Sequence, residues 1–136
     1  MSLGQIAPAG IAQYYMARTV LVADDNPLIR KILCRFFEAE EDYDICAEAT
    51  NGQEAIELAL KHRPELIILD FSMPIMNGPE AAKELKKLMP AIPIILFTQF
   101  AEASNAIPRE ELQVDRIVSK IDVIELMNHV KSLLPA

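Results

Sequence analysis

The feature that most constrains the fold is a set of short apolar runs, most of which end in a charged or hydroxyl residue. Two of them, at residues 65–70 and 92–98, are apolar at successive rather than alternate positions. This pattern is typical of strands buried on both faces of a parallel sheet. Similar runs lie at residues 19–25, 43–50 and 113–120. The sequence therefore predicts five strands, and the weak alternation of residues 43–50 favours an edge position.

Helical periodicity separates these runs. The first predicted helix begins at Asn26 and Pro27, which favour the N-cap and the first helical position. Its apolar residues recur with a period near 3.6 and predict one buried stripe. The stripe consists of Leu28, Ile29, Ile32, Leu33, Phe36 and Phe37.

Three further helices are predicted at residues 51–64, 77–90 and 121–134. In the first of these, Asn51 and Glu54 fit a capping box. Its predicted inner stripe consists of Ala55, Ile56, Ala59 and Leu60. Strands alternating with helices predict an α/β fold, a single doubly wound five-stranded parallel sheet with helices on both faces.

The length of 136 residues suits one hydrophobic core. We expect residues 1–17 to form a flexible extension and residues 18–136 to form the domain. No apolar run approaches the ~20 residues of a membrane span, and the absence of basic residues before Arg18 argues against a signal peptide. We therefore expect a cytoplasmic protein that binds no membrane. Cys34 and Cys46 lack metal-site spacing and are expected to be reduced.

The formal net charge of −7 argues against direct nucleic-acid binding, which needs a basic face. The simplest meaning of this charge is solubility.

Polar residues follow the predicted strands at the points where sites form in open α/β sheets. These are Asp24, Asp25, Asp70, Thr98 and Lys120. Because the carboxyl ends of parallel strands meet at one edge, we expect the five side chains to converge there.

Three carboxylates at this edge require a cation. At ~5 Å and an effective dielectric constant near 20, each pair repels by about 3 kcal/mol. Lys120 supplies one positive charge, and a divalent metal supplies two. All-oxygen ligands select Mg²⁺, Mn²⁺ or Ca²⁺. A carboxylate is also a nucleophile that forms an aspartyl-phosphate. A metal on Asp25 and Asp70, with Lys120 and Thr98 nearby, has the parts that phosphoryl transfer needs.

The chain resembles the receiver domain of two-component response regulators over roughly residues 18–134. The matching segments are VLVADDNP, IILDFSMPIMNG, ILFT and IVSK, in the family's order. The resemblance implies a flavodoxin-like sheet in the order 2-1-3-4-5 with five helices. It also implies a domain that catalyses its own phosphorylation and dephosphorylation without being a conventional turnover enzyme.

The resemblance assigns roles to the residues at this edge. Asp70 is the implied phosphoacceptor, and Asp25 is the implied direct Mg²⁺ ligand, supported by Asp24. The backbone carbonyl of Ser72 is the implied third protein ligand, and Mn²⁺ is an alternative ion.

The resemblance also implies a switch and partners. Thr98 and Lys120 bind the phosphoryl group and carry the switch. The implied partners are a sensor histidine kinase or phosphotransfer protein, and an output domain or protein that binds through residues 99–134. We expect residues 99–112 to be the mobile part that responds to phosphorylation.

Four features depart from the family pattern. Ile117 replaces an aromatic residue, Ile121 replaces a proline, and Gln99 stands where a small residue is usual. Gln99 either covers Asp70 or points to solvent. The expected fourth helix, near residues 101–110, has few core-facing residues and contains Pro108.

Each of the five edge residues also has a simpler interpretation. The two consecutive acids can cap the first helix, Asp70 can be a turn residue, and Thr98 and Lys120 can be ordinary strand ends. All of these would have to hold together to remove the site.

Other functions remain open at this point. One is a receiver-like interaction module with a weakened or lost switch, which Gln99 and Ile117 favour. A flavodoxin-like cofactor carrier needs an anion-binding loop after the first strand, where this chain is acidic. A haloacid-dehalogenase-type phosphatase needs a second aspartate where Ser72 stands.

Overall fold

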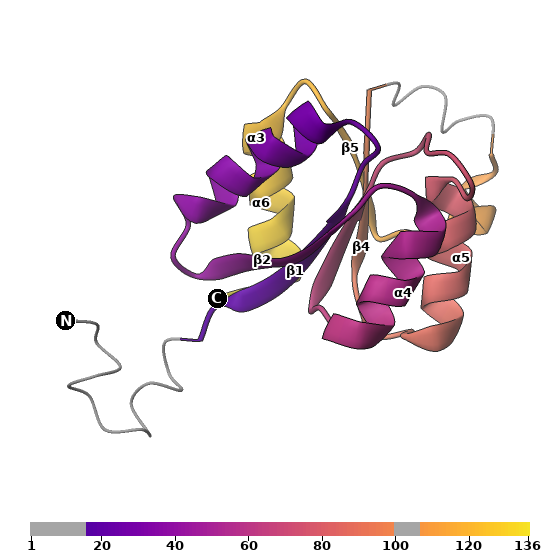
Figure 1. Ribbon diagram of the computed structural model, residues 1–136, viewed down its shortest axis with the longest axis horizontal. Helices are drawn as coiled ribbons and strands as arrows, with labels where there is room; N and C mark the ends of the chain where they lie inside the picture. Colours follow the sequence, from indigo (N-terminus) through magenta and orange to yellow (C-terminus); the bar gives the residue numbers. More distant parts are fainter. Residues whose placement is uncertain (1–15, 100–106) are drawn as a thin grey trace.

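The computed structural model describes residues 16–99 and 107–136. Five parallel strands form one sheet in the order β2-β1-β3-β4-β5. Helices cover both faces (Figure 1), so the predicted α/β fold and strand order are confirmed. Nearly all of the expected extension, residues 1–17, lies outside the described residues.

The described part contains five strands, four α-helices and one short 3₁₀ helix. In chain order these are β1 (Arg18–Ala23), α3 (Pro27–Glu38), β2 (Tyr43–Ala49), α4 (Gly52–His62), β3 (Leu66–Leu69), α5 (Gly78–Leu88), β4 (Ile94–Thr98), η3 (Arg109–Glu111), β5 (Arg116–Ser119) and α6 (Val123–Leu133).

The sheet separates two apolar cores. Helices α3 and α6 cover one face, and α4 and α5 cover the other (Figure 1). Successive residues of β1 alternate between them, so Val20 and Val22 face α3 and α6 while Leu21 and Ala23 face α4 and α5. This two-sided burial explains the uninterrupted apolar runs in the sequence.

Two predicted stripes were too wide. In α3, Leu33 and Phe37 are buried, whereas Leu28 and Phe36 are 61% and 41% exposed. In α4, Leu60 is 41% exposed. Each helix packs on a sheet along one narrow line, so the apolar residues at the margins of the stripe remain in contact with water.

The predicted capping box of α4 is shifted by one residue. Asn51 accepts a hydrogen bond from the Glu54 amide at 2.8 Å as expected, but the Glu54 carboxylate accepts from the Thr50 amide. The complete box is at α5, where Asn77 and Glu80 each accept from the other's backbone amide.

A β-bulge interrupts the edge strand β2. The ladder pairs Val20 with Ile45 and then Leu21 with Ala47, which leaves Cys46 as the extra residue. Ile45 packs on the α3–α6 side and Ala47 on the α4–α5 side. The bulge therefore accounts for the weak alternation of this segment, and the edge position is confirmed.

The expected fourth helix lies mostly outside the described residues, because residues 100–106 are not described. The part that follows forms only the 3₁₀ helix η3, and Leu112 then enters the protein interior. The expected mobility of residues 99–112 falls largely on the same segment and stays a prediction.

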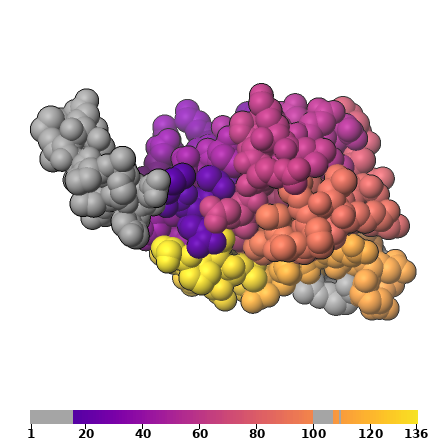
Figure 2. All heavy atoms as spheres, turned by 90° about the horizontal axis from the view of Figure 1, so that it is seen from below, coloured from indigo at the N-terminus to yellow at the C-terminus, as the bar shows by residue number. Residues whose placement is uncertain are grey.

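The C-terminal residues pack beside the start of β1 (Figure 2). Arg18 donates a hydrogen bond to the carbonyl oxygen of Pro135 at 2.9 Å, and the Tyr43 hydroxyl donates to that of Leu134 at 2.6 Å.

Cys34 and Cys46 are free thiols, as expected. In the part of the chain that is described, no helix is long and apolar enough to cross a membrane.

Candidate functional site

The structure brings the five predicted residues to one edge of the sheet. Asp24 and Asp25 follow β1, Asp70 follows β3, Thr98 ends β4 and Lys120 follows β5. Contacts link the strand ends, because the Asp70 amide donates to the carbonyl that ends β1 and the Lys120 amide donates to the Thr98 carbonyl at 2.9 Å. The predicted meeting of the strand ends is therefore confirmed.

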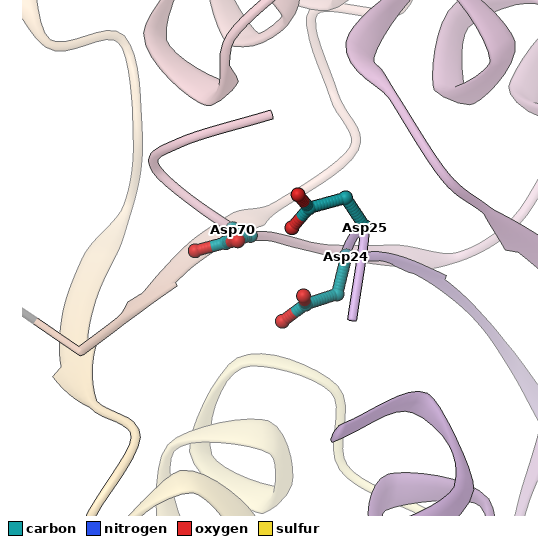
Figure 3. A group of neighbouring side chains, drawn as sticks. All are labelled: Asp24, Asp25 and Asp70. Carbon is teal, nitrogen blue, oxygen red and sulfur yellow. The ribbon is translucent and has the colours of Figure 1, made fainter. Parts of the chain in front are cut away.

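The three acids form a compact cluster. One carboxylate oxygen from each of Asp24, Asp25 and Asp70 lies within 4.8 Å of the others. Asp24 and Asp70 are buried, and Asp25 is exposed. The carboxylates of Asp24 and Asp25 leave the end of β1 on different sides and are directed toward the side where Asp70 lies (Figure 3). Solvent therefore reaches the cluster through Asp25.

Lys120 supplies one positive charge to the acidic cluster. Its Nζ lies 2.6 Å from Oδ2 of Asp24 and 3.1 Å from Oδ1 of Asp70, and its side chain is only 11% exposed. Burial by itself lowers the pKa of Lys120, but hydrogen bonds and ion pairs with the two acids outweigh burial and raise it. Lys120 therefore remains charged at neutral pH.

The ionised form of Asp70 lies in an unfavourable electrostatic environment. Burial raises its pKa, the charge of Asp24 raises it further, and Lys120 offsets only part of this, so the pKa is about 6. At neutral pH the carboxylate is ionised but incompletely compensated, and a second cation nearby lowers its energy.

The donor set fits a hard divalent cation. All three side chains offer carboxylate oxygens, and one ammonium group balances only one of their three charges. Oxygen ligands of this kind suit Mg²⁺ or Mn²⁺, and an exposed ligand such as Asp25 allows the ion to keep several water molecules.

The loop after β3 is held tightly around the site. The Gly78 amide donates to the Phe71 carbonyl at 2.9 Å, and a Cβ on Gly78 would overlap the backbone carbonyl of Asp70. Gly78 thus permits close approach and does not supply a positive φ. Ser72, whose carbonyl the sequence nominated, lies in this loop with an exposed side chain.

The same loop contains an unusual backbone conformation that the sequence does not predict. Ile75 has a φ of 70° and is 82% exposed. The Met76 amide donates to the Pro74 carbonyl at 2.7 Å, which closes a tight turn at Ile75. A β-branched residue with this φ is strained, and nothing in the local residue pattern indicates it.

The three residues that depart from the family pattern lie in β5 or directly after the strand-end residues Thr98 and Lys120. Gln99 follows β4 and is exposed. Ile117 is partly buried and packs against the core under α4 and α5. Ile121, next to Lys120, is 89% exposed.

The parallel sheet and the acidic cluster at its carboxyl edge define a flavodoxin-like class of domain with an acidic site. The family described as "Response regulator receiver domain" matches residues 20–131. This match covers most of the chain, and the chain belongs to this family. The family binds Mg²⁺ at an acidic site of this type.

Individual relatives agree with this assignment. The transcriptional regulatory protein PdtaR of Mycobacterium tuberculosis is 42% identical over 94 residues, which are 68% of this chain and 45% of PdtaR. The chain spans between 24% and 45% of the length of three curated relatives that it matches.

Solved structures are similar as well. The Thermotoga maritima response regulator TrrA, in complex with Mg²⁺ and beryllofluoride, has a TM-score of 0.77 and 35% identity, and the match covers 86% of this chain and 99% of TrrA. Rhodobacter sphaeroides CheY6, solved in complex with the P1 domain of CheA3, has a TM-score of 0.72 and 28% identity, with 88% and 98% coverage. The chain is therefore a receiver domain of two-component signalling.

Proposed function

We propose that Asp70 is the phosphoacceptor of this receiver. The observation that carries the proposal is a buried carboxylate whose pKa is about 6, beside two other acids and a half-buried lysine. An ionised oxygen of Asp70 attacks the phosphorus of the donor, a P–O bond forms, and the bond to the donor's leaving group breaks. The raised pKa favours this step, because a more basic carboxylate is a better nucleophile.

We further propose that Mg²⁺ is held by Asp25, Asp70 and the backbone carbonyl of Ser72, with Asp24 in support and Mn²⁺ as a substitute. The ion supplies positive charge to the phosphoryl oxygens when it is bound. Asp25 is suited to direct contact because it is exposed, whereas Asp24 already forms a 2.6 Å ion pair with Lys120.

Lys120 and Thr98 are the proposed partners of the transferred group. Lys120 lies 3.1 Å from Asp70 and can move its hydrogen bonds to the new phosphoryl oxygens, each of which is a strong acceptor. Thr98 is buried at the neighbouring strand end and supplies a hydroxyl.

The proposed phosphodonor is a histidine kinase or a phosphotransfer protein, as for receiver domains in general. The proposed output surface is residues 99–134, which bind an output domain or a protein partner without direct contact to nucleic acid or membrane. The proposed location is the cytoplasm, in line with the family.

The switch is proposed to act through residues 99–112. Ile117 has no ring to exchange between the core and the surface, so the usual aromatic route is not available to this chain. Hydrogen exchange with and without beryllofluoride tests this. Changes in protection confined to other segments would refute it.

The deciding experiment is phosphorylation by a small donor. The purified chain is incubated with acetyl phosphate and Mg²⁺, and its intact mass is measured. We expect a gain of one phosphoryl group that is lost at high pH, is prevented by EDTA and is absent from Asp70→Asn. Asp44→Asn is a matched control, because it removes the same charge from an exposed position on β2. Equal labelling of Asp70→Asn and wild type would refute the assignment.

A further inference from the structure

Arg30 joins the edge strand β2 to the loop that carries the acidic pair. Its Nη1 donates a hydrogen bond to the backbone carbonyl oxygen of Asp24 at 2.7 Å. Its Nε lies 3.4 Å from Oε1 of Glu48, and the Arg30 side chain is only 18% exposed. Nothing in the sequence distinguishes Arg30, because an arginine on a helix is ordinarily a solvated residue.

The β-bulge places Glu48 where Arg30 can reach it. Glu48 pairs with Val22, whose side chain faces α3 and α6. If Cys46 took its own place in a regular ladder, Ala47 would share the face of Ile45, and Glu48 would lie on the opposite face, toward α4. Bulges near functional sites commonly re-aim a side chain in this way. The bulge therefore sets up the contact between β2 and α3.

The hydrogen bond from Arg30 holds the peptide unit that leads into Asp25. The carbonyl of Asp24 belongs to the planar peptide unit that joins Asp24 to Asp25, so a donor on this oxygen fixes the orientation of the whole unit. The other side of Asp24 is also held, because its amide donates to the Ala49 carbonyl at 3.0 Å. With both groups fixed, the backbone leads into Asp25 in one direction.

We propose that Arg30 is a positioning residue for the metal-binding carboxylate of Asp25, which it holds through the Asp24 carbonyl. The inference rests on the proposed function, since it assumes that Asp25 is a Mg²⁺ ligand. Glu48 in turn holds the guanidinium, so the end of β2, the start of α3 and the metal ligand form one connected unit.

The direction in which Mg²⁺ affinity changes when Arg30 is replaced distinguishes a positioning role from a simple effect of charge. Arg30 is a cation near a cation site, so its charge alone opposes Mg²⁺ binding, and its removal would then tighten binding. Positioning predicts the opposite. Groups that orient a metal ligand typically contribute at least about tenfold to metal affinity. We therefore expect Arg30→Met to bind Mg²⁺ about tenfold more weakly than wild type.

The test is calorimetric titration of the metal-free chain with MgCl₂. Arg30→Met removes the donors and keeps an apolar stem. Arg30→Lys keeps the charge, but one ammonium group cannot replace a guanidinium that contacts both Asp24 and Glu48, so we expect it to weaken binding as well. Arg35→Met is the matched control, because it removes an arginine from the exposed last turn of the same helix. We expect its affinity to equal that of wild type.

The outcomes are distinguishable. If wild type binds no Mg²⁺, the proposed function fails and the role of Arg30 fails with it. If wild type binds Mg²⁺ and Arg30→Met binds equally or more tightly, the role of Arg30 is wrong and the proposed function stands. If Arg30→Met does not fold, Arg30→Lys decides, and unchanged affinity in that variant overturns the inference.

Discussion

Replacing Asp70 with asparagine should stabilise the metal-free protein at neutral pH. The carboxyl has a pKa of about 6 in the folded chain, compared with an ordinary value of 3.8. Because one pKa unit corresponds to about 1.4 kcal/mol, ionised Asp70 costs the folded state about 3 kcal/mol. Asparagine carries no charge, and its amide oxygen can still accept a hydrogen bond from Lys120.

The stability difference between Asp70→Asn and wild type should depend on pH. The folded state holds its proton more tightly than the unfolded state, so the cost of Asp70 appears as pH rises from 3.8 to about 6 and is complete above that range. The advantage of Asp70→Asn should therefore grow from about 1.5 kcal/mol near pH 5 to about 3 kcal/mol near pH 7.5. Below pH 3.8 it should disappear.

Urea denaturation in the presence of EDTA measures both effects. Asp44→Asn makes the same change in net charge at an exposed position of β2 and should alter stability by less than about 0.5 kcal/mol. Added Mg²⁺ should stabilise wild type more than Asp70→Asn, because ligand binding to the folded state adds stability. If Asp70→Asn is no more stable than wild type at either pH, Asp70 does not carry the electrostatic cost described here.

Three further predictions concern the surroundings of the site. Gly78→Ala should destabilise the fold by about 2 kcal/mol in urea denaturation, because the new Cβ overlaps a backbone carbonyl that cannot move aside; a neutral effect would mean that the loop is compliant. Ile75→Gly should stabilise the fold by about 0.5–1 kcal/mol, because it relieves a positive φ at an exposed residue. Ile121→Gly is the control and should not stabilise the fold, because Ile121 has no positive φ. Equal effects of the two substitutions would contradict the strain at Ile75. In Mg²⁺ titrations Asp25→Ala should weaken binding far more than Asp24→Ala, and the reverse order would mean that the direct ligand is misassigned.

The main features of the fold followed from local patterns. Apolar runs such as residues 65–70 and 92–98 carry enough information because burial on both faces leaves no polar position in a strand. The polar residues that end the strands predicted the site, since topology alone brings those ends together. The site chemistry was accessible for the same reason, because three acids with one lysine imply a cation wherever they meet.

Finer features, such as which leucines are buried and where the β-bulge lies, could not be predicted from local patterns. The exposed Leu28 and Leu60 have the same hydrophobicity as the buried Leu33, and only the line of contact with the sheet separates them. The bulge at Cys46 depends on the register between β1 and β2. Its sequence signature is merely a weak alternation, which an ordinary edge strand produces equally well.

The sequence by itself determined which residues stand at the ends of the strands, and with them the class of domain and its chemistry. Tertiary structure decided how those residues behave. The pKa of Asp70 depends on its burial and on the position of Asp24, and the contact of Arg30 with the Asp24 carbonyl depends on how α3 packs against β2. The physical reason is that strand order and polarity are properties of the chain, whereas burial, charge pairing and peptide orientation are set by distances between segments that only the folded state defines.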